Sequence, residues 1–154
     1  MSYSRAEDVL GMIKDSMLNA ILGGEEYITD RSELYAAALP YAEAAVADAD
    51  SEIDGYLCKR YRIPLTAVPP VIEKFSKDIA VYNMVARTGI DESDREKTVL
   101  NRYNAAVVYL TNVAKGIVDI MTEESGAASA GSGNGGFRIS SNRRKFTRND
   151  MRGW

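Results

Sequence analysis

The sequence has 154 residues, of which 45% are hydrophobic and 27% charged, values typical of a single globular domain that folds in water. It contains no histidine and one cysteine, Cys58, which excludes an internal disulfide and histidine-activated nucleophiles and argues against a thiolate metal cage. No apolar run reaches the roughly 20 residues that span a bilayer, and the N-terminus lacks an apolar signal segment. We therefore expect no enzyme, no metal or cofactor, and no membrane partner.

Charge is unevenly distributed along the chain. Residues 137–154 contain six basic side chains and one acidic side chain, a net charge of +5. The other 13 basic and 21 acidic residues give the rest of the chain a net charge of −8. The overall charge of −3 therefore conceals an acidic body followed by a basic end.

The first half of the chain predicts two helices. Ser4 and Glu7 fit a capping box, and the apolar residues that follow step by three and four as far as Gly23-Gly24. A second helical pattern begins near Ser32 and continues through Leu57, with many alanines that would let a neighbouring helix approach closely. Pro40 interrupts this pattern, so we expect a kink or a new helix start there.

The region from residue 64 onward predicts two more helices. Pro64 ends the second pattern, and the pair at 69–70 suits the first turn of a third helix that Gly89 ends. Ser93 and Glu96 form a second possible capping box, at the start of a fourth helix expected to be the longest in the chain. Its predicted buried stripe is Leu100, Tyr103, Val107, Leu110, Ala114 and Ile117. The predicted fold class is all-α, a four-helix domain over residues 1–125.

The sequence changes character after residue 125. The stretch "GAASAGSGNGG", residues 126–136, has no side chain able to form a core, and such a segment is expected to be a flexible tether with a reach of roughly 18 Å. Residues 137–154 have too few apolar side chains to fold alone and would order against a partner. The side chains of this predicted docking arm are Phe137, Arg138, Arg143, Arg144, Lys145, Phe146, Arg148, Arg152 and Trp154.

Two interpretations of this arm stay open. Basic residues interleaved with aromatic ones can bind single-stranded nucleic acid or phosphate backbones. The same composition could dock onto an acidic protein surface, which the body of this chain would itself supply.

Ionisable and aromatic residues gather where the second helix is expected to end, in "SEIDGYLCKRYRIPL". Arg60 lies on the azimuth of the apolar stripe, and Asp78 flanks the stripe of the third helix, so we expect a structural ion pair that fixes the angle between the two helices. A catalytic arrangement is the weaker interpretation, because no phosphate loop, metal cluster or nucleophile beside a base accompanies it. The acids between Asp48 and Asp54 alternate along the helix, which is typical of solvated flanks.

The central and final parts of the sequence resemble a known family. The matching residues are Ser51, Ile53, Asp54, Tyr56, Leu57, Arg60, Tyr61, Pro64, Leu65, Asp78, Ile79, Ala80 and Tyr82. Together with the ending "SSNRRKFTRNDMRGW", they resemble the small proteins encoded in the head gene clusters of Mu-like phages and prophages. That family is regarded as similar to the head-tail connector, or adaptor, proteins of long-tailed phages.

The resemblance implies a function and a set of partners. It implies a structural virion protein, assembled in the bacterial host cytoplasm, that forms a homo-oligomeric ring below the portal and extends the DNA channel. The implied partners are other copies of the chain, the portal protein and a tail-completion protein, with DNA passing through without sequence recognition. The alternative from the residues alone is a small nucleic-acid-binding accessory protein that uses the basic tail.

Overall fold

The computed structural model describes residues 2–24, 27–89 and 94–120. The chain divides into two units, Met1–Glu123 and Glu124–Trp154, and the described residues all belong to the first. The predicted tether and docking arm therefore lie outside the described residues. The helices are α1 (Ala6–Met12), α2 (Asp15–Leu22), α3 (Arg31–Leu57), α4 (Pro70–Val85), the short 3₁₀ helix η1 (Ala86–Thr88) and α5 (Asp94–Lys115). The described residues contain no strand, which confirms the all-α prediction for this part of the chain.

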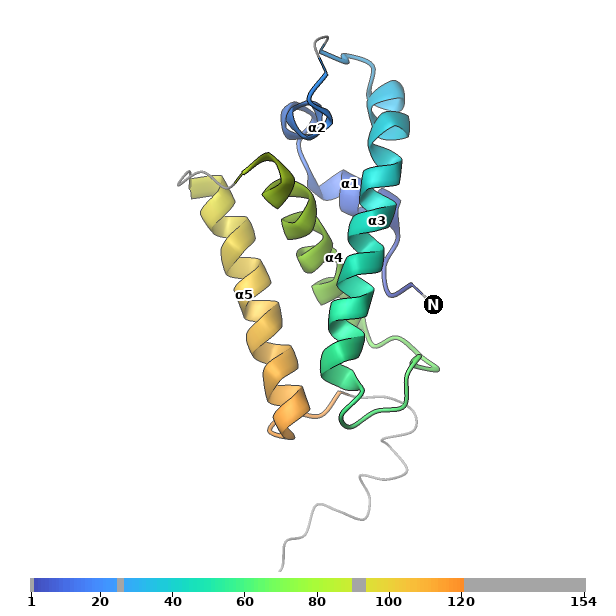
Figure 1. Ribbon diagram of the computed structural model, residues 1–154, viewed down its shortest axis with the longest axis vertical. Helices are drawn as coiled ribbons and strands as arrows, with labels where there is room; N and C mark the ends of the chain where they lie inside the picture. The colour runs from blue at the N-terminus through green and yellow to red at the C-terminus, as the bar shows by residue number, and fades with distance from the viewer. Residues whose placement is uncertain (1, 25–26, 90–93, 121–154) are drawn as a thin grey trace, which may run out of the picture. The chain divides into compact units, whose positions relative to one another are not determined.

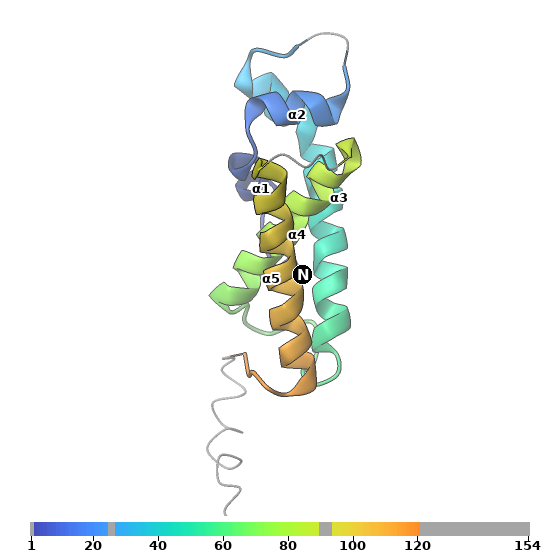
Figure 2. The ribbon, with the colours of Figure 1, turned by 90° about the vertical axis from the view of Figure 1, so that its left-hand side faces the viewer.

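The long helices α3, α4 and α5 lie side by side, and α1 and α2 pack against this group near the start of α3 (Figures 1 and 2). Within the described part of the chain, helix α3 contacts each of the other four α-helices, whereas α5 contacts only α3 and α4. The largest fully buried side chains include Leu10, Leu18, Leu34, Ile53, Leu57, Ile72, Ile79, Met84 and Leu110. Ala38, Ala42 and Ala49 of α3 are completely buried, so the alanines do provide close helix contacts.

The first predicted helix is two helices, so the described residues contain five α-helices. Ile13 and Lys14 are extended, and Ile13 is 5% exposed because the break turns it into the core. The Leu10 carbonyl at the end of α1 accepts from the Ile13 amide at 3.1 Å and also from the Tyr35 hydroxyl of α3 at 3.4 Å. The capping box is also wrong, because Arg5 is the N-cap residue and no side chain caps α1. A tertiary contact thus joins the end of this helix to α3.

Helix α3 is continuous through Pro40, so of the two alternatives predicted there, a kink or a new helix start, the new start is wrong. Pro40 and Ala36, whose carbonyl the proline leaves without its helical donor, are both exposed, and water can therefore reach the disrupted turn. With 27 residues, α3 is longer than α5 with 22, which corrects the expectation that the fourth predicted helix would be the longest.

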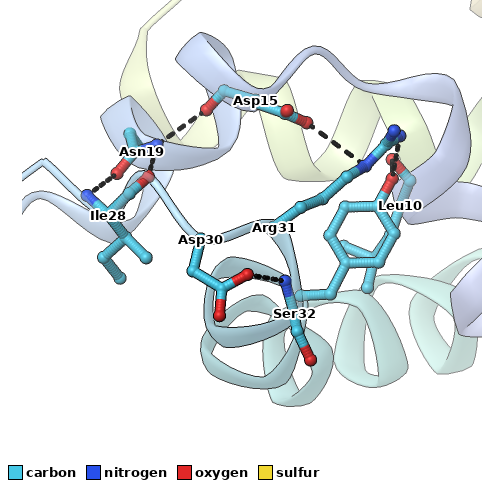
Figure 3. Close-up of polar contacts among 8 residues, drawn as sticks. Leu10, Asp15, Asn19, Ile28, Asp30, Arg31 and Ser32 are labelled. Atoms are coloured by element: carbon cyan, nitrogen blue, oxygen red, sulfur yellow. Dashed lines mark hydrogen bonds and ion pairs between the residues drawn. The ribbon is translucent and has the colours of Figure 1, made fainter.

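The connection between α2 and α3 is closed by side chains (Figure 3). The side-chain amide of Asn19 donates to the Ile28 backbone carbonyl at 3.2 Å, and its oxygen accepts from the Ile28 backbone amide at 2.8 Å. Asp30 caps α3 by accepting a hydrogen bond from the Ser32 amide at 3.1 Å. Arg31 forms an exposed ion pair with Asp15 of α2 at 3.8 Å. These contacts hold the start of α3 against α2.

Helix α4 begins at Pro70 with Pro69 as its N-cap residue, so the two prolines lie at the helix start as predicted. The α-helix ends at Val85, and the 3₁₀ helix η1 continues to Thr88 before the chain turns at Gly89 with φ = 85°. The buried line of α5 differs in part from the predicted stripe. Ala106, Leu110 and Val113 are completely buried, whereas Ile117 is 70% exposed and follows the end of the helix. The Ser93 and Glu96 capping box lies outside the described side chains.

Candidate interaction site

Arg60 closes the corner where α5 ends, near the end of α3. Its guanidinium donates to the carbonyls of Val113 and Val118, at 3.2 and 3.3 Å, and pairs with the Asp119 carboxylate at 2.8 Å. The neighbouring Tyr61 hydroxyl accepts a hydrogen bond from the Ile120 amide at 3.1 Å. We call this group the exit corner, because it holds the last described residues of the chain.

Asp78 lies elsewhere, between α4 and α5. Its side chain is completely buried and accepts from Lys74 at 2.9 Å and from the Arg102 guanidinium of α5. The structure therefore does not bring Arg60 and Asp78 together, and each has other partners. The predicted pair assumed that the α3–α4 connector would bring both charges to one corner, but Asp78 lies midway along α4 and faces α5.

An aromatic and acidic contact joins α5 to the other long helices. The Tyr103 ring of α5 stacks on Tyr82 of α4 with ring centres 4.1 Å apart, and its hydroxyl donates to Glu52 of α3 at 3.1 Å. Burial, and then the charge and hydrogen bond of Glu52, raise the pKa of Tyr103 to about 12. The phenol therefore stays neutral and donates throughout the physiological range.

A polar clamp fixes the N-terminal segment against α3 and α4. The Tyr3 amide and the Ser76 hydroxyl both donate to Asp50 at 3.2 Å, and the hydroxyls of Ser4 and Ser76 are 2.8 Å apart. The Tyr3 hydroxyl donates to Asp54. Burial first, and then these acids, raise the pKa of Tyr3. Asp50, Glu52 and Asp54 are thus half-buried acceptors rather than the solvated flank that the sequence suggested.

A groove of about 630 Å³ lies between this clamped segment and α3. Its walls come from residues 2–7 on one side and from α3 on the other. The α3 residues are Leu39, Glu43, Val46, Ala47 and Asp50, and the N-terminal residues include Arg5, Ala6 and Glu7. We call this the acidic groove, because three carboxylates and one guanidinium surround an apolar floor.

The outer face of α5 is almost uncharged. Exposed residues on it are Asn101, Asn104, Ala105 and Val108, and the Val108 side chain is 60% exposed. Between residues 98 and 114 the single charged side chain is Arg102, which pairs with Asp78. Charge depletion of this kind is a property of the core of protein–protein interfaces. This surface, the α5 face, is a second candidate contact.

The described side chains include no cluster of three or more potential metal ligands. Within the same residues, no helix is sufficiently long and apolar to cross a bilayer. The strongly shifted groups, Tyr3 and Tyr103, are each explained by burial and a hydrogen bond that joins helices or segments. The arrangement is that of a structural network.

The described residues form a helical protein with polar contacts between its helices. Its uncharged helix face and its acidic groove are surfaces that suit protein contacts. The family model for Bacteriophage Mu, Gp36 matches residues 3–139, most of the chain, so the chain belongs to that family and is a Mu-like phage protein. "Gene product J" of Escherichia phage Mu is 34% identical over 88 residues, which cover 57% of this chain and 58% of that protein. The match thus spans a little over half of the length of that relative.

Sequence reasoning missed three parts of the site. It did not include Arg102 as the partner of Asp78, Asp119 as the partner of Arg60, or the clamp that Tyr3 forms with α3. Arg102 offered a signal, because it is the single charge in a long uncharged stretch of helix. The clamp offered none, since residues 3 and 54 are brought together by tertiary structure.

Proposed function

We propose that this protein is a structural component of the phage head, a head-tail connector that assembles as a homo-oligomeric ring below the portal and links head to tail. The observation that carries the proposal is the α5 face. A helix with an exposed run of alanine, asparagine and valine, lacking free charge over 17 residues, is suited to be covered by another copy. Membership of a Mu phage family agrees with a role in the particle.

The acidic body suits a DNA channel. Like charges repel, so a surface with a net charge of −8 would let DNA slide past without adhering to it. The basic residues 137–154 would then serve protein contacts with a neighbouring subunit, the portal or a tail-completion protein. This role requires neither a cofactor nor a catalytic centre.

Electron microscopy of the concentrated full chain tests the proposal. We expect closed rings, and we expect Ala105→Lys to abolish them, because it buries a charge in the subunit contact. Ala20→Lys is the matched control, since Ala20 is also an exposed helical alanine but lies on α2. Both variants should keep the melting temperature of the parent chain. Absence of rings at any concentration, alone and with portal protein, would contradict the proposal.

A second measurement separates this function from nucleic-acid binding. The accessory-protein interpretation requires the full chain to bind DNA tightly, with an affinity that falls steeply as salt increases. The connector interpretation predicts weak DNA binding that the ring does not strengthen. Gel-shift titrations at two salt concentrations, with ringed and ring-deficient protein, distinguish the two.

A further inference from the structure

We propose that the acidic groove binds the Arg143–Arg148 segment of a second copy of this chain, so that the arm of one subunit fastens onto its neighbour. This inference rests on the proposed function, because it assumes that copies assemble. It goes beyond that function by naming the two surfaces that meet.

The groove is formed before any partner arrives. Its N-terminal wall is held by the hydrogen bonds of Tyr3 to Asp50 and Asp54 and by the contact of Ser4 with buried Ser76. Its opposite wall is the middle of α3, which is a single uninterrupted helix. A preorganised site of this kind avoids the ordering cost that weakens binding to mobile surfaces.

The charges of the groove are largely uncompensated. Among the described residues, neither the Glu7 nor the Glu43 carboxylate has a hydrogen bond or an ion pair, and both residues are exposed. With Asp50 and Arg5, the groove has a net charge of −2. Arg5 also acts on Glu73 of α4, whose pKa is lowered chiefly by Lys77 and to a smaller extent by Arg5. A ligand with several cations is therefore favoured here.

The arm contains a segment of matching chemistry. The sequence "RRKFTR", residues 143–148, has four cations around a single aromatic residue, Phe146. The floor of the groove is apolar, with half-buried Leu39 and nearly buried Val46. In this arrangement the Phe146 ring covers the floor while the cations reach the carboxylates on the rim. In such contacts an aromatic anchor usually supplies most of the binding energy, and the charged rim supplies specificity and a faster association rate.

The test uses a fluorescently labelled peptide of residues 137–154 and the full chain with its own arm reversed by R143E, R144E and K145E. We expect saturable binding, measured by fluorescence anisotropy, and we expect the affinity to fall as salt increases. Adding Glu43→Lys to the receptor should reduce the affinity about tenfold. Asp48→Lys is the matched control and should change it by less than about twofold, because a five-residue step places Asp48 roughly 140° away around α3.

The peptide provides a second matched pair. Phe146→Ala should weaken binding about tenfold, whereas Phe137→Ala, outside the proposed segment, should have little effect. Circular dichroism melts should show that every receptor variant folds like its parent. Absence of binding, equal losses from Glu43→Lys and Asp48→Lys, or indifference to Phe146→Ala would each overturn the inference.

Mixing two full-length variants tests whether the arm comes from a second copy. A groove-reversed chain, E7K with E43K, and the arm-reversed chain should each fail to associate through this contact. Together they should form a complex in sedimentation velocity, because each arm then faces a groove of opposite charge. If the mixture does not associate although the peptide binds, the arm fills its own groove and the proposed second copy is wrong.

The result can be separated from that of the proposed function. Rings that form equally well with the groove-reversed chain would leave the connector proposal intact and overturn the contact between groove and arm. A groove-dependent complex that never closes into a ring, even with portal protein, would leave the contact intact and overturn the connector proposal.

Discussion

The Asp78 carboxylate of α4 accepts from the Arg102 guanidinium of α5 while its own side chain is completely buried. Among the described side chains, the single further cation that contacts it is Lys74, one turn earlier on the same helix, at 2.9 Å. Arg102 is therefore the residue through which α5 satisfies a charge that α4 buries. This ion pair and the Tyr103 contacts attach α5 to the other long helices.

Removing Arg102 should cost more stability than removing Lys74. Arg102→Ala leaves the buried carboxylate with one exposed partner, and we expect a loss of about 1–3 kcal/mol in the free energy of unfolding. Lys74→Ala is the control, because its side chain is 62% exposed and Asp78 retains Arg102. Denaturant titrations monitored by circular dichroism measure both values. Equal losses of unfolding free energy in the two variants would show that the Arg102 contact stabilises the fold no more than the Lys74 contact does.

Arg60 should couple to Asp119 and not to Asp78. The Arg60–Asp119 pair is partly exposed, so a double-mutant cycle should give a coupling of about 0.2–1 kcal/mol. The corresponding cycle with Asp78 should give a coupling within experimental error of zero. Arg60→Ala should also speed hydrogen exchange of the Ile120 amide, because the exit corner then loses its bonds to Val113 and Val118.

Alkaline pH should weaken the attachment of α5. The folded-state pKa of Tyr103 is raised from 10.0 to about 12, so the neutral phenol is favoured by folding. Its contribution to stability is fully present below pH 10 and is lost as the pH rises through about 12. Tyr103→Phe should therefore flatten the fall in melting temperature over this range. Tyr27→Phe, which alters an exposed ring, should leave the slope unchanged.

Asn19 should stabilise the fold through both the nitrogen and the oxygen of its side-chain amide. Asn19→Ala removes the two hydrogen bonds to the backbone of Ile28, and we expect a loss of about 1 kcal/mol or more, because the loop groups are only partly exposed to water. Ser16→Ala, an exposed change on the same helix, is the control and should be nearly neutral. A melt in which both variants match the parent would contradict the role assigned to Asn19.

The helical regions could be predicted because their signals are local. Apolar residues at steps of three and four, the prolines at 69–70 and the glycine at 89 indicate α3, α4 and the end of the third predicted helix. The errors occurred where a distant group intervenes. Ile13, at the break after α1, is buried in the core, and Asp78 pairs with Arg102 of another helix.

By itself, the sequence determined the all-α class, most helix boundaries and the contrast between an acidic body and a basic end, because these follow from periodicity and composition. It could not determine which charges pair, since Asp78 and Arg102 are 24 positions apart and Tyr3 and Asp54 are 51 apart. Only tertiary structure decides such pairs, because burying a charged or polar group is tolerated only where another helix brings a partner to it. The acidic groove arises in the same way, from residues 2–7 and α3 meeting across the fold.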